Sequence, residues 1–293
     1  MSTAQADDSG PEFDPTLVAD GPATVAGLVL SSGRPSQSTP LRRTFVQPAE
    51  RDRQPTGGPL AALVRHRDRR ALILYLLVLT MASTEPWDAR RDSRIWARAL
   101  DVGGGRSGRE AVSKALRRLR GLQLIVTSRV NRLSAVTMLR EDGSGEPYTY
   151  PTPDQRQDRY LRLPFAFWTD RWYQRLNLPA VAMLLVLLAE KDGVVLPLDR
   201  ISTWYGISRA TAQRGLAELE SHGLLQVRTV QRAEPLAPLG FTYDRHHHLQ
   251  GVFERSRPGR PEENVTELKP TAAKRRRLRR KLTATEGKEV IAP

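Results

Sequence analysis

Three glycines in the stretch DVGGGRSGRE have the spacing of a phosphate-binding turn. Gly103, Gly105 and Gly108 match G-x-G-x-x-G, in which the glycines let the backbone approach a dinucleotide pyrophosphate closely. Such a loop follows a buried, nearly continuous apolar strand, whereas the preceding DSRIWARALDV carries arginines at helical spacing. A P-loop requires Lys and then Ser or Thr after its last glycine, where this chain has Arg109 and Glu110. We therefore expect the glycines to form a turn between two helices.

The residues after these glycines predict a helix suited to contacts with DNA. A capping box of Ser107 and Glu110 places its start at about Gly108. Its core-facing stripe consists of Val112, Leu116 and Leu119. The exposed side chains suit nucleic acid, because arginine can fork onto guanine and small hydroxyls bind phosphate oxygens. The predicted DNA-binding residues are Arg106 just before this helix and Arg109, Ser113, Lys114 and Arg117 on it, with Arg129 and Arg132 in a two-stranded wing that turns near Asn131.

The same order of features occurs a second time in the chain. Residues 200–230 overlay on residues 94–130, so that Leu116 meets Leu216 and Leu119 meets Leu219. Gly206 ends a short helix, Ser208 caps the next one and Gly223 closes it. Strands are expected in LLQVRTV and in GFTYDRHHHLQGVF. The predicted DNA-binding residues of this second copy are Ser208, Arg209, Thr211, Gln213, Arg214 and Arg228.

These elements predict a mainly α fold with small β-wings, built from two winged helix-turn-helix domains in series. The predicted segments are a disordered arm over residues 1–58, a first domain over 59–150, a second over 151–255 and a basic disordered tail over 256–293. Each domain is expected to begin with an apolar run of 12 residues, 71–82 and 178–189, which is too short to cross a membrane. We expect both runs to be buried core helices.

Composition favours nucleic acid as the partner. The formal net charge is +14, mostly from arginine, and residues 59–150 hold 17 basic against 9 acidic side chains. The chain has no cysteine, which excludes disulfides, Cys-containing zinc sites and thiol nucleophiles. We expect a cytoplasmic, nucleoid-associated protein that binds double-stranded DNA, with no membrane contact, catalytic residue, metal or cofactor. A homodimer and contacts with the replication or transcription machinery remain open.

The stretch YLRLPFAFWTDRWYQRLNLPAVAMLLVLLAEKDG, with the helix-turn-helix after it, carries a resemblance to known DNA-binding proteins. Through Tyr160, Leu163-Pro164, Trp168, Leu176 and Leu178 it resembles plasmid replication initiators built from tandem winged helices, and bacterial helix-turn-helix regulators. In the initiators this stretch usually opens the first winged helix, whereas here it opens the second. The resemblance implies two helices in successive major grooves and an output in either transcription regulation or replication initiation.

Two other classes of function compete with this interpretation. Rolling-circle nicking enzymes use a tyrosine nucleophile near a histidine metal pair, and YDRHHH places Tyr243 near His246 to His248. The middle residue of that run is His247 rather than an apolar residue, and no third ligand lies nearby in the sequence. An RNA-binding protein could use the basic tail KRRRLRRK, but the chain lacks aromatic residues expected to be exposed as stacking platforms.

Overall fold

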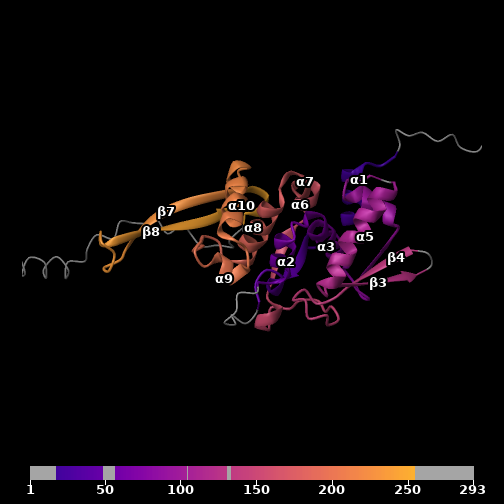
Figure 1. The fold of residues 1–293 in the computed structure, drawn as a ribbon, viewed down its shortest axis with the longest axis horizontal. Coiled ribbons are helices and arrows are strands. Elements are labelled where there is room, and N and C mark those ends of the chain that lie inside the picture. Colours follow the sequence, from indigo (N-terminus) through magenta and orange to yellow (C-terminus); the bar gives the residue numbers. More distant parts are fainter. Residues whose placement is uncertain (1–17, 49–56, 104, 131–132, 255–293) are drawn as a thin grey trace, which may run out of the picture. The chain divides into compact units, whose positions relative to one another are not determined.

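The computed structural model describes residues 18–48, 57–103, 105–130 and 133–254 (Figure 1). The prediction of a mainly α fold made of two winged helix-turn-helix domains is wrong. The fold is mixed α/β, with 45% helix and 21% strand, and its strands form three small antiparallel sheets. The sequence prediction missed the short strands, because segments of two to five residues are too short to show a strand period.

A first helix–sheet unit, from α3 to β4, lies in the first half of the chain. Its elements are α3 (Arg69–Met81), β2 (Asp88–Arg91), α4 (Ser93–Ala99), α5 (Arg106–Gly121), β3 (Ile125–Val130) and β4 (Leu133–Met138). The sheet order is β2-β4-β3, and β3 pairs antiparallel with β4 from Ile125–Met138 to Val130–Leu133; the turn predicted near Asn131 lies outside the described residues. Helix α5 packs against α3, α4 and β3.

A second helix–sheet unit repeats this order from α8 to β8. Its elements are α8 (Leu178–Ala189), β6 (Val194–Val195), α9 (Ile201–Tyr205), α10 (Arg209–Ser221), β7 (Leu225–Ala233) and β8 (Phe241–Leu249). The sheet order is β6-β8-β7, which corresponds strand for strand to the first sheet. The internal repeat in the sequence therefore has a structural counterpart.

Residues 18–48 are folded, so the predicted disordered arm is wrong for this stretch. Helix α1 (Gly21–Leu30) is capped by Asp20, whose carboxylate accepts from the Ala23 amide at 2.7 Å. Strand β1 (Ser38–Arg42) is fully buried and pairs antiparallel with β5 (Tyr160–Pro164). Because all five residues of β1 are buried, the strand shows no alternation of polar and apolar residues from which it could be predicted.

The remaining elements are short. They are the helices α2 (Pro59–Arg65), α6 (Ala166–Thr169) and α7 (Trp172–Arg175) and the single 3-10 turns at Arg43–Phe45, Arg156–Asp158 and Gly251–Phe253. One hydrophobic core runs from Val25 to Phe253 and contains both apolar helices, α3 and α8. The prediction that these two are buried core helices is confirmed. Among the described residues, no helix is both long and apolar enough to span a bilayer.

The proposed boundary between two domains at residue 150 stays a prediction. Strand β1 pairs with β5 across that position, and α2 contacts α8. Arg42 on β1 is completely buried, where its guanidinium binds Glu141 and donates to Asp158 at 2.7 Å. The tail at 256–293 lies outside the described residues.

Candidate nucleic-acid interface

Helix α5 presents one apolar face and one basic face. Val112, Ala115 and Leu119 are buried, whereas Leu116, expected in the same stripe, is only half-buried. The predicted DNA-binding side chains on this helix are all exposed: Arg106, Arg109, Ser113, Lys114 and Arg117. Spacings of three and four residues place them on one side of the helix. The structure thus brings these predicted residues together on one surface.

The charge on α5 is strongly unbalanced. The helix carries six basic side chains and one carboxylate, that of Glu110. Arg106 donates to Glu110 at 2.9 Å, and Arg118 lies 3.7 Å from Asp68. In the described part of the chain, Arg109, Lys114 and Arg117 form no ion pair. Their charge is therefore available to an anionic partner.

The glycines before α5 serve backbone packing. Gly103 has a left-handed φ of +79°, and Gly105 is the N-cap residue of α5. A Cβ at Gly108 would lie 1.9 Å from the Gly103 carbonyl oxygen, so only glycine fits there. The element before them is helix α4 and not a strand, so the dinucleotide-binding interpretation lacks its β-strand. Gly104 lies outside the described residues.

The predicted capping box at the start of α5 is wrong. The helix begins at Arg106 rather than at Gly108, and Gly105 caps it without a side-chain hydrogen bond. Glu110 accepts from Arg106 instead of reaching back to a backbone amide. With no acidic residue in the first turn, the partial positive charge of the helix N-terminus adds to the basic face.

The hairpin of β3 and β4 follows α5 directly. Arg129, a predicted DNA-binding residue, is exposed on β3, where it pairs with Ser134 of β4. Arg132, predicted for the same role, lies outside the described residues. Arg94 on α4 is also exposed, and Arg90 on β2 donates to Asp88 at 2.8 Å. Sequence reasoning did not include Arg90 and Arg94 in the site, since neither lies on the predicted recognition helix.

Helix α10 has a smaller and nearly neutral exposed face. Ser208 caps the helix as predicted, since its hydroxyl accepts from the Thr211 amide at 3.3 Å. The Thr211 hydroxyl lies 2.9 Å from that of Ser208 and accepts from Arg214 at 3.3 Å. Arg209 donates to Asp199 at 2.8 Å. Gln213 is exposed on the same helix.

Close packing fixes the position of α10. Gly215 is buried, and a Cβ there would lie 2.3 Å from the Pro179 carbonyl oxygen at the start of α8. Any other residue at this position would push the two helices apart. Arg228 on β7 is exposed and donates to Gln226 at 3.3 Å. The structure therefore places the predicted residues of this unit on α10 and the adjoining strand.

The three histidines on β8 contact Asp192 and Gly193, just before β6, and Val194, its first residue. Their Nδ1 atoms lie 2.9 Å from the Gly193 carbonyl for His246, 3.1 Å from the Val194 carbonyl for His247 and 3.1 Å from the Asp192 carboxylate for His248. Burial lowers the pKa of His247 below its ordinary value. Among the described residues, no group of three or more His, Cys, Asp or Glu side chains is arranged to hold a metal ion.

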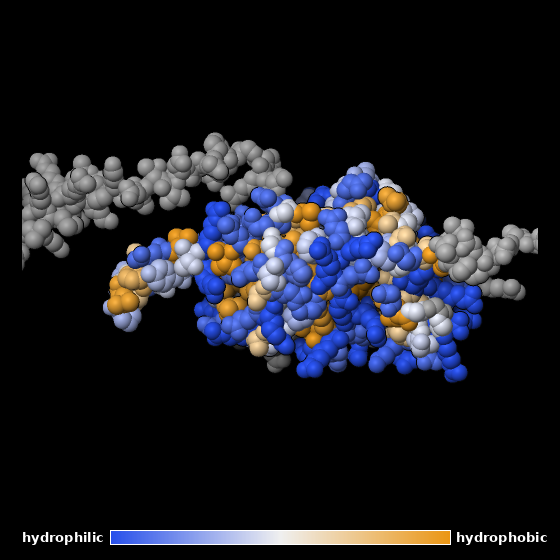
Figure 2. Space-filling model, turned by 90° about the horizontal axis from the view of Figure 1, so that it is seen from above, coloured by the Kyte–Doolittle hydropathy of each residue, from blue (hydrophilic) through white to orange (hydrophobic). Residues whose placement is uncertain are grey.

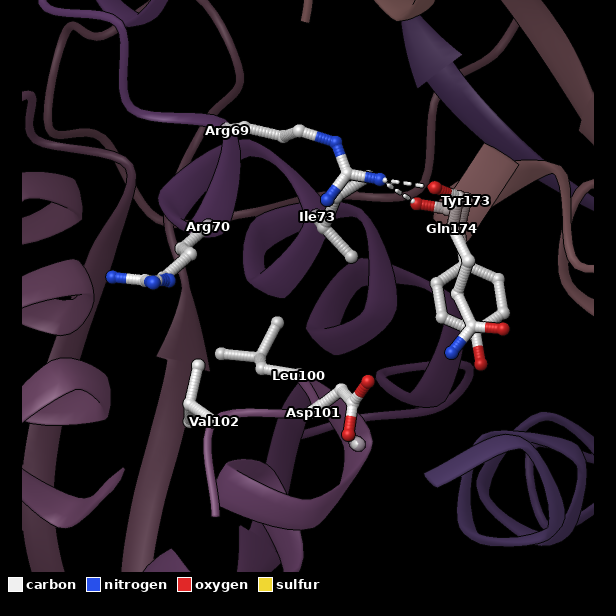
Figure 3. Close-up of a pocket in the computed structure, with 9 residues that line it drawn as sticks. Arg69, Arg70, Ile73, Leu100, Asp101, Val102, Tyr173 and Gln174 are labelled. Atoms are coloured by element: carbon white, nitrogen blue, oxygen red, sulfur yellow. Dashed lines mark hydrogen bonds between the residues drawn. The ribbon is translucent and has the colours of Figure 1, made fainter. Parts of the chain in front are cut away.

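A small pocket of about 270 Å³ is lined by α3, by α7 and by the segment that follows α4 (Figure 3). Arg69 crosses it and donates to the backbone carbonyls of Leu176 and Gln174, both at 3.1 Å, and to that of Tyr173. Partial burial lowers the pKa of this arginine. Because its guanidinium is already engaged by three carbonyls, Arg69 links α3 to α7 and is not a ligand-binding group.

Comparisons of the chain with protein-family models, curated proteins and solved structures give no match. Function is therefore inferred from the surface of α5 and α10.

Proposed function

We propose that the protein binds double-stranded DNA sequence-specifically, with α5 and α10 each entering a major groove. The observation that carries this proposal is the basic face of α5, where Arg109, Lys114 and Arg117 are exposed and form no ion pair among the described residues. A major groove about 12 Å wide admits an α-helix, whose side chains then reach base edges and flanking phosphates. An arginine-rich helix face suits this partner because guanidinium can bind guanine O6 and N7 together.

The two helices would contribute differently to binding. Helix α5 has an excess of five positive charges, whereas α10 carries two arginines and two glutamates. Phosphate contacts give salt-dependent affinity, and base-edge contacts give discrimination. We assign most of the affinity to α5 and more of the sequence discrimination to Gln213 and Thr211 on α10. Equal losses for Arg109→Ala and Gln213→Ala on specific and random DNA would refute this division.

The cellular role that we propose rests on the same surface. The protein would act without a catalytic site, as a bacterial transcription regulator or as a replication initiator of a plasmid or mobile element, in the cytoplasm with the nucleoid. Arg129 and Arg228 on the hairpins that follow the two helices would contact adjacent phosphates. Contacts with the replication or transcription machinery would follow from either role.

Selection of bound sequences from a random double-stranded library tests the proposal. At about 150 mM salt, where nonspecific charge contacts are partly screened, we expect an enriched motif with two separate parts. The position of that motif beside promoters or as repeats in an origin distinguishes a regulator from an initiator. Failure to enrich any motif, together with equal affinity for unrelated duplexes, contradicts sequence-specific binding.

A further inference from the structure

The hairpin of β7 and β8 carries a cluster of exposed apolar side chains at its far end. In Figure 2, hydrophobic residues cover the end of the hairpin that extends from the rest of the described protein. Leu236 is 94% exposed and Leu239 is 76% exposed, and both lie in the loop that joins the strands. Val230 and Tyr243 on the strands are at least half exposed. Exposed apolar clusters of this kind mark interaction surfaces.

One face of the hairpin continues the core-facing side of its sheet. Leu225 and Leu249 are paired and buried, and the pairs Gln231–Tyr243 and Ala233–Phe241 follow on the same side of the two strands. The rings of Phe241 and Tyr243 contact each other with centroids 5.5 Å apart. Figure 1 shows that the hairpin of β7 and β8 extends beyond α10 toward its loop end.

Strand β7 also has an edge without a partner among the described strands. In the order β6-β8-β7 it is an outer strand over nine residues, and it contains no proline or lysine. Such edges usually carry a residue that prevents pairing with another chain. Arg232 does not serve this purpose, because it is bound within its own hairpin by Glu234 at 3.1 Å and Asp244 at 3.0 Å.

We propose that β7 pairs antiparallel with β7 of a second copy of this chain, about a two-fold axis at Thr229. In this register Arg228 faces Val230 of the second copy, and Gln226 faces Arg232, so that no like charges are opposed. Centring the axis on Val230 would oppose Arg228 and Arg232, and centring it on Arg228 would oppose two copies of that arginine. Charge therefore selects a single register among neighbouring ones.

Charge favours a second copy over nucleic acid as the occupant of the β7 edge, and the Arg228 side chain, on the face of the sheet opposite Tyr243, stays available to phosphate. The proposed contact uses the nine residues of β7 and the loop that carries Leu236 and Leu239. The hairpin holds three arginines against two carboxylates, far fewer positive charges than α5 provides, whereas DNA interfaces are strongly positive. In the proposed register Ala233 faces Leu225 of the second copy, so the loop with Leu236 and Leu239 packs near the end of its α10.

Cysteine cross-linking of the full chain tests the register. The natural chain has no cysteine, so Thr229→Cys introduces a single thiol. Directly opposed residues in an antiparallel pair have Cα atoms about 4.5–5.5 Å apart, within disulfide range, so we expect a covalent dimer under mild oxidation. Gln231→Cys is the matched control, because its two copies would lie four residues out of register, about 13 Å apart. We expect no cross-link at that position.

Light scattering across about a hundredfold range of protein concentration, without DNA, measures the association itself. We expect a dimer, and for the double variant Leu236→Ser/Leu239→Ser at least about a tenfold rise in its dissociation constant. Leu30→Ser is the control, since Leu30 on α1 is also 76% exposed but lies outside the hairpin. Circular dichroism confirms that each variant is folded.

A monomer at every concentration, without cross-linking of Thr229→Cys, overturns the proposal and leaves DNA or another protein as the occupant of the hairpin. A dimer that cross-links equally well through Gln231→Cys overturns the register. Loss of dimer in the Leu30→Ser control assigns the interface to another surface. None of these results depends on DNA binding, so the proposed function is tested separately.

Discussion

Replacing Gly108 with alanine tests whether the glycines before α5 serve packing. The added Cβ would lie 1.9 Å from the Gly103 carbonyl oxygen and 2.9 Å from that of Val102, and both are backbone atoms. Relieving the contact requires a backbone shift of about 1 Å, and overpacking of this kind costs about 1–3 kcal/mol. Alanine's better helix propensity offsets about 0.5–1 kcal/mol. We expect the free energy of unfolding to fall by about 1–2 kcal/mol and the melting temperature by about 2–8 °C.

Gly121→Ala is the matched control on the same helix. Gly121 is the last residue of α5, and a Cβ added to it would have no other atom within 4 Å. The alanine there should leave stability unchanged or raise it by up to about 1 kcal/mol. Urea unfolding followed by circular dichroism measures both variants. Equal stability of Gly108→Ala and Gly121→Ala would refute the close approach between the turn and α5.

Three further outcomes follow from particular contacts. Ser208→Ala removes the cap of α10 and should lower the free energy of urea unfolding by about 1 kcal/mol, whereas an unchanged value would show that the cap is not formed. Glu141→Gln removes one of the two carboxylates that pair with the buried Arg42 guanidinium, while Asp158 remains, and should lower the free energy of unfolding by about 1.5–3 kcal/mol in the same assay. His247 has a lowered pKa in the folded state, so its neutral form is favoured on folding. The contribution of neutral His247 to the free energy of unfolding is complete above the unfolded pKa of about 6.5 and is lost as the pH falls below it. His247→Gln should therefore lose less melting temperature than the wild type between about pH 7 and pH 5.5. Parallel plots of melting temperature against pH for the two proteins would contradict this.

Local patterns in the sequence predicted much of the candidate site. The exposed face of α5 and the cap at Ser208 both depend on neighbours a few residues apart. Helical periodicity and capping chemistry act over that distance, so they can be recognised in one sequence. The role of these residues in binding DNA stays a prediction.

Features that depend on distant partners could not be predicted. Strand β1 is buried by pairing with β5 more than a hundred residues later, and its composition resembles a linker. The need for glycine at position 215 arises from the Pro179 carbonyl of another helix. Tertiary packing determines these features, so they are not visible in the local sequence.

The salt dependence of DNA affinity tests the central claim most directly. Removing one phosphate-binding side chain lowers the slope of log K against log salt by about 0.9. For the double variant Arg109→Ala/Arg117→Ala we expect this slope to fall by up to about two, with weaker binding to all duplexes. Arg162 is an exposed arginine on β5, and its control variant Arg162→Ala should keep the slope of the wild type. Identical slopes for the wild type and both variants would contradict a DNA interface on α5.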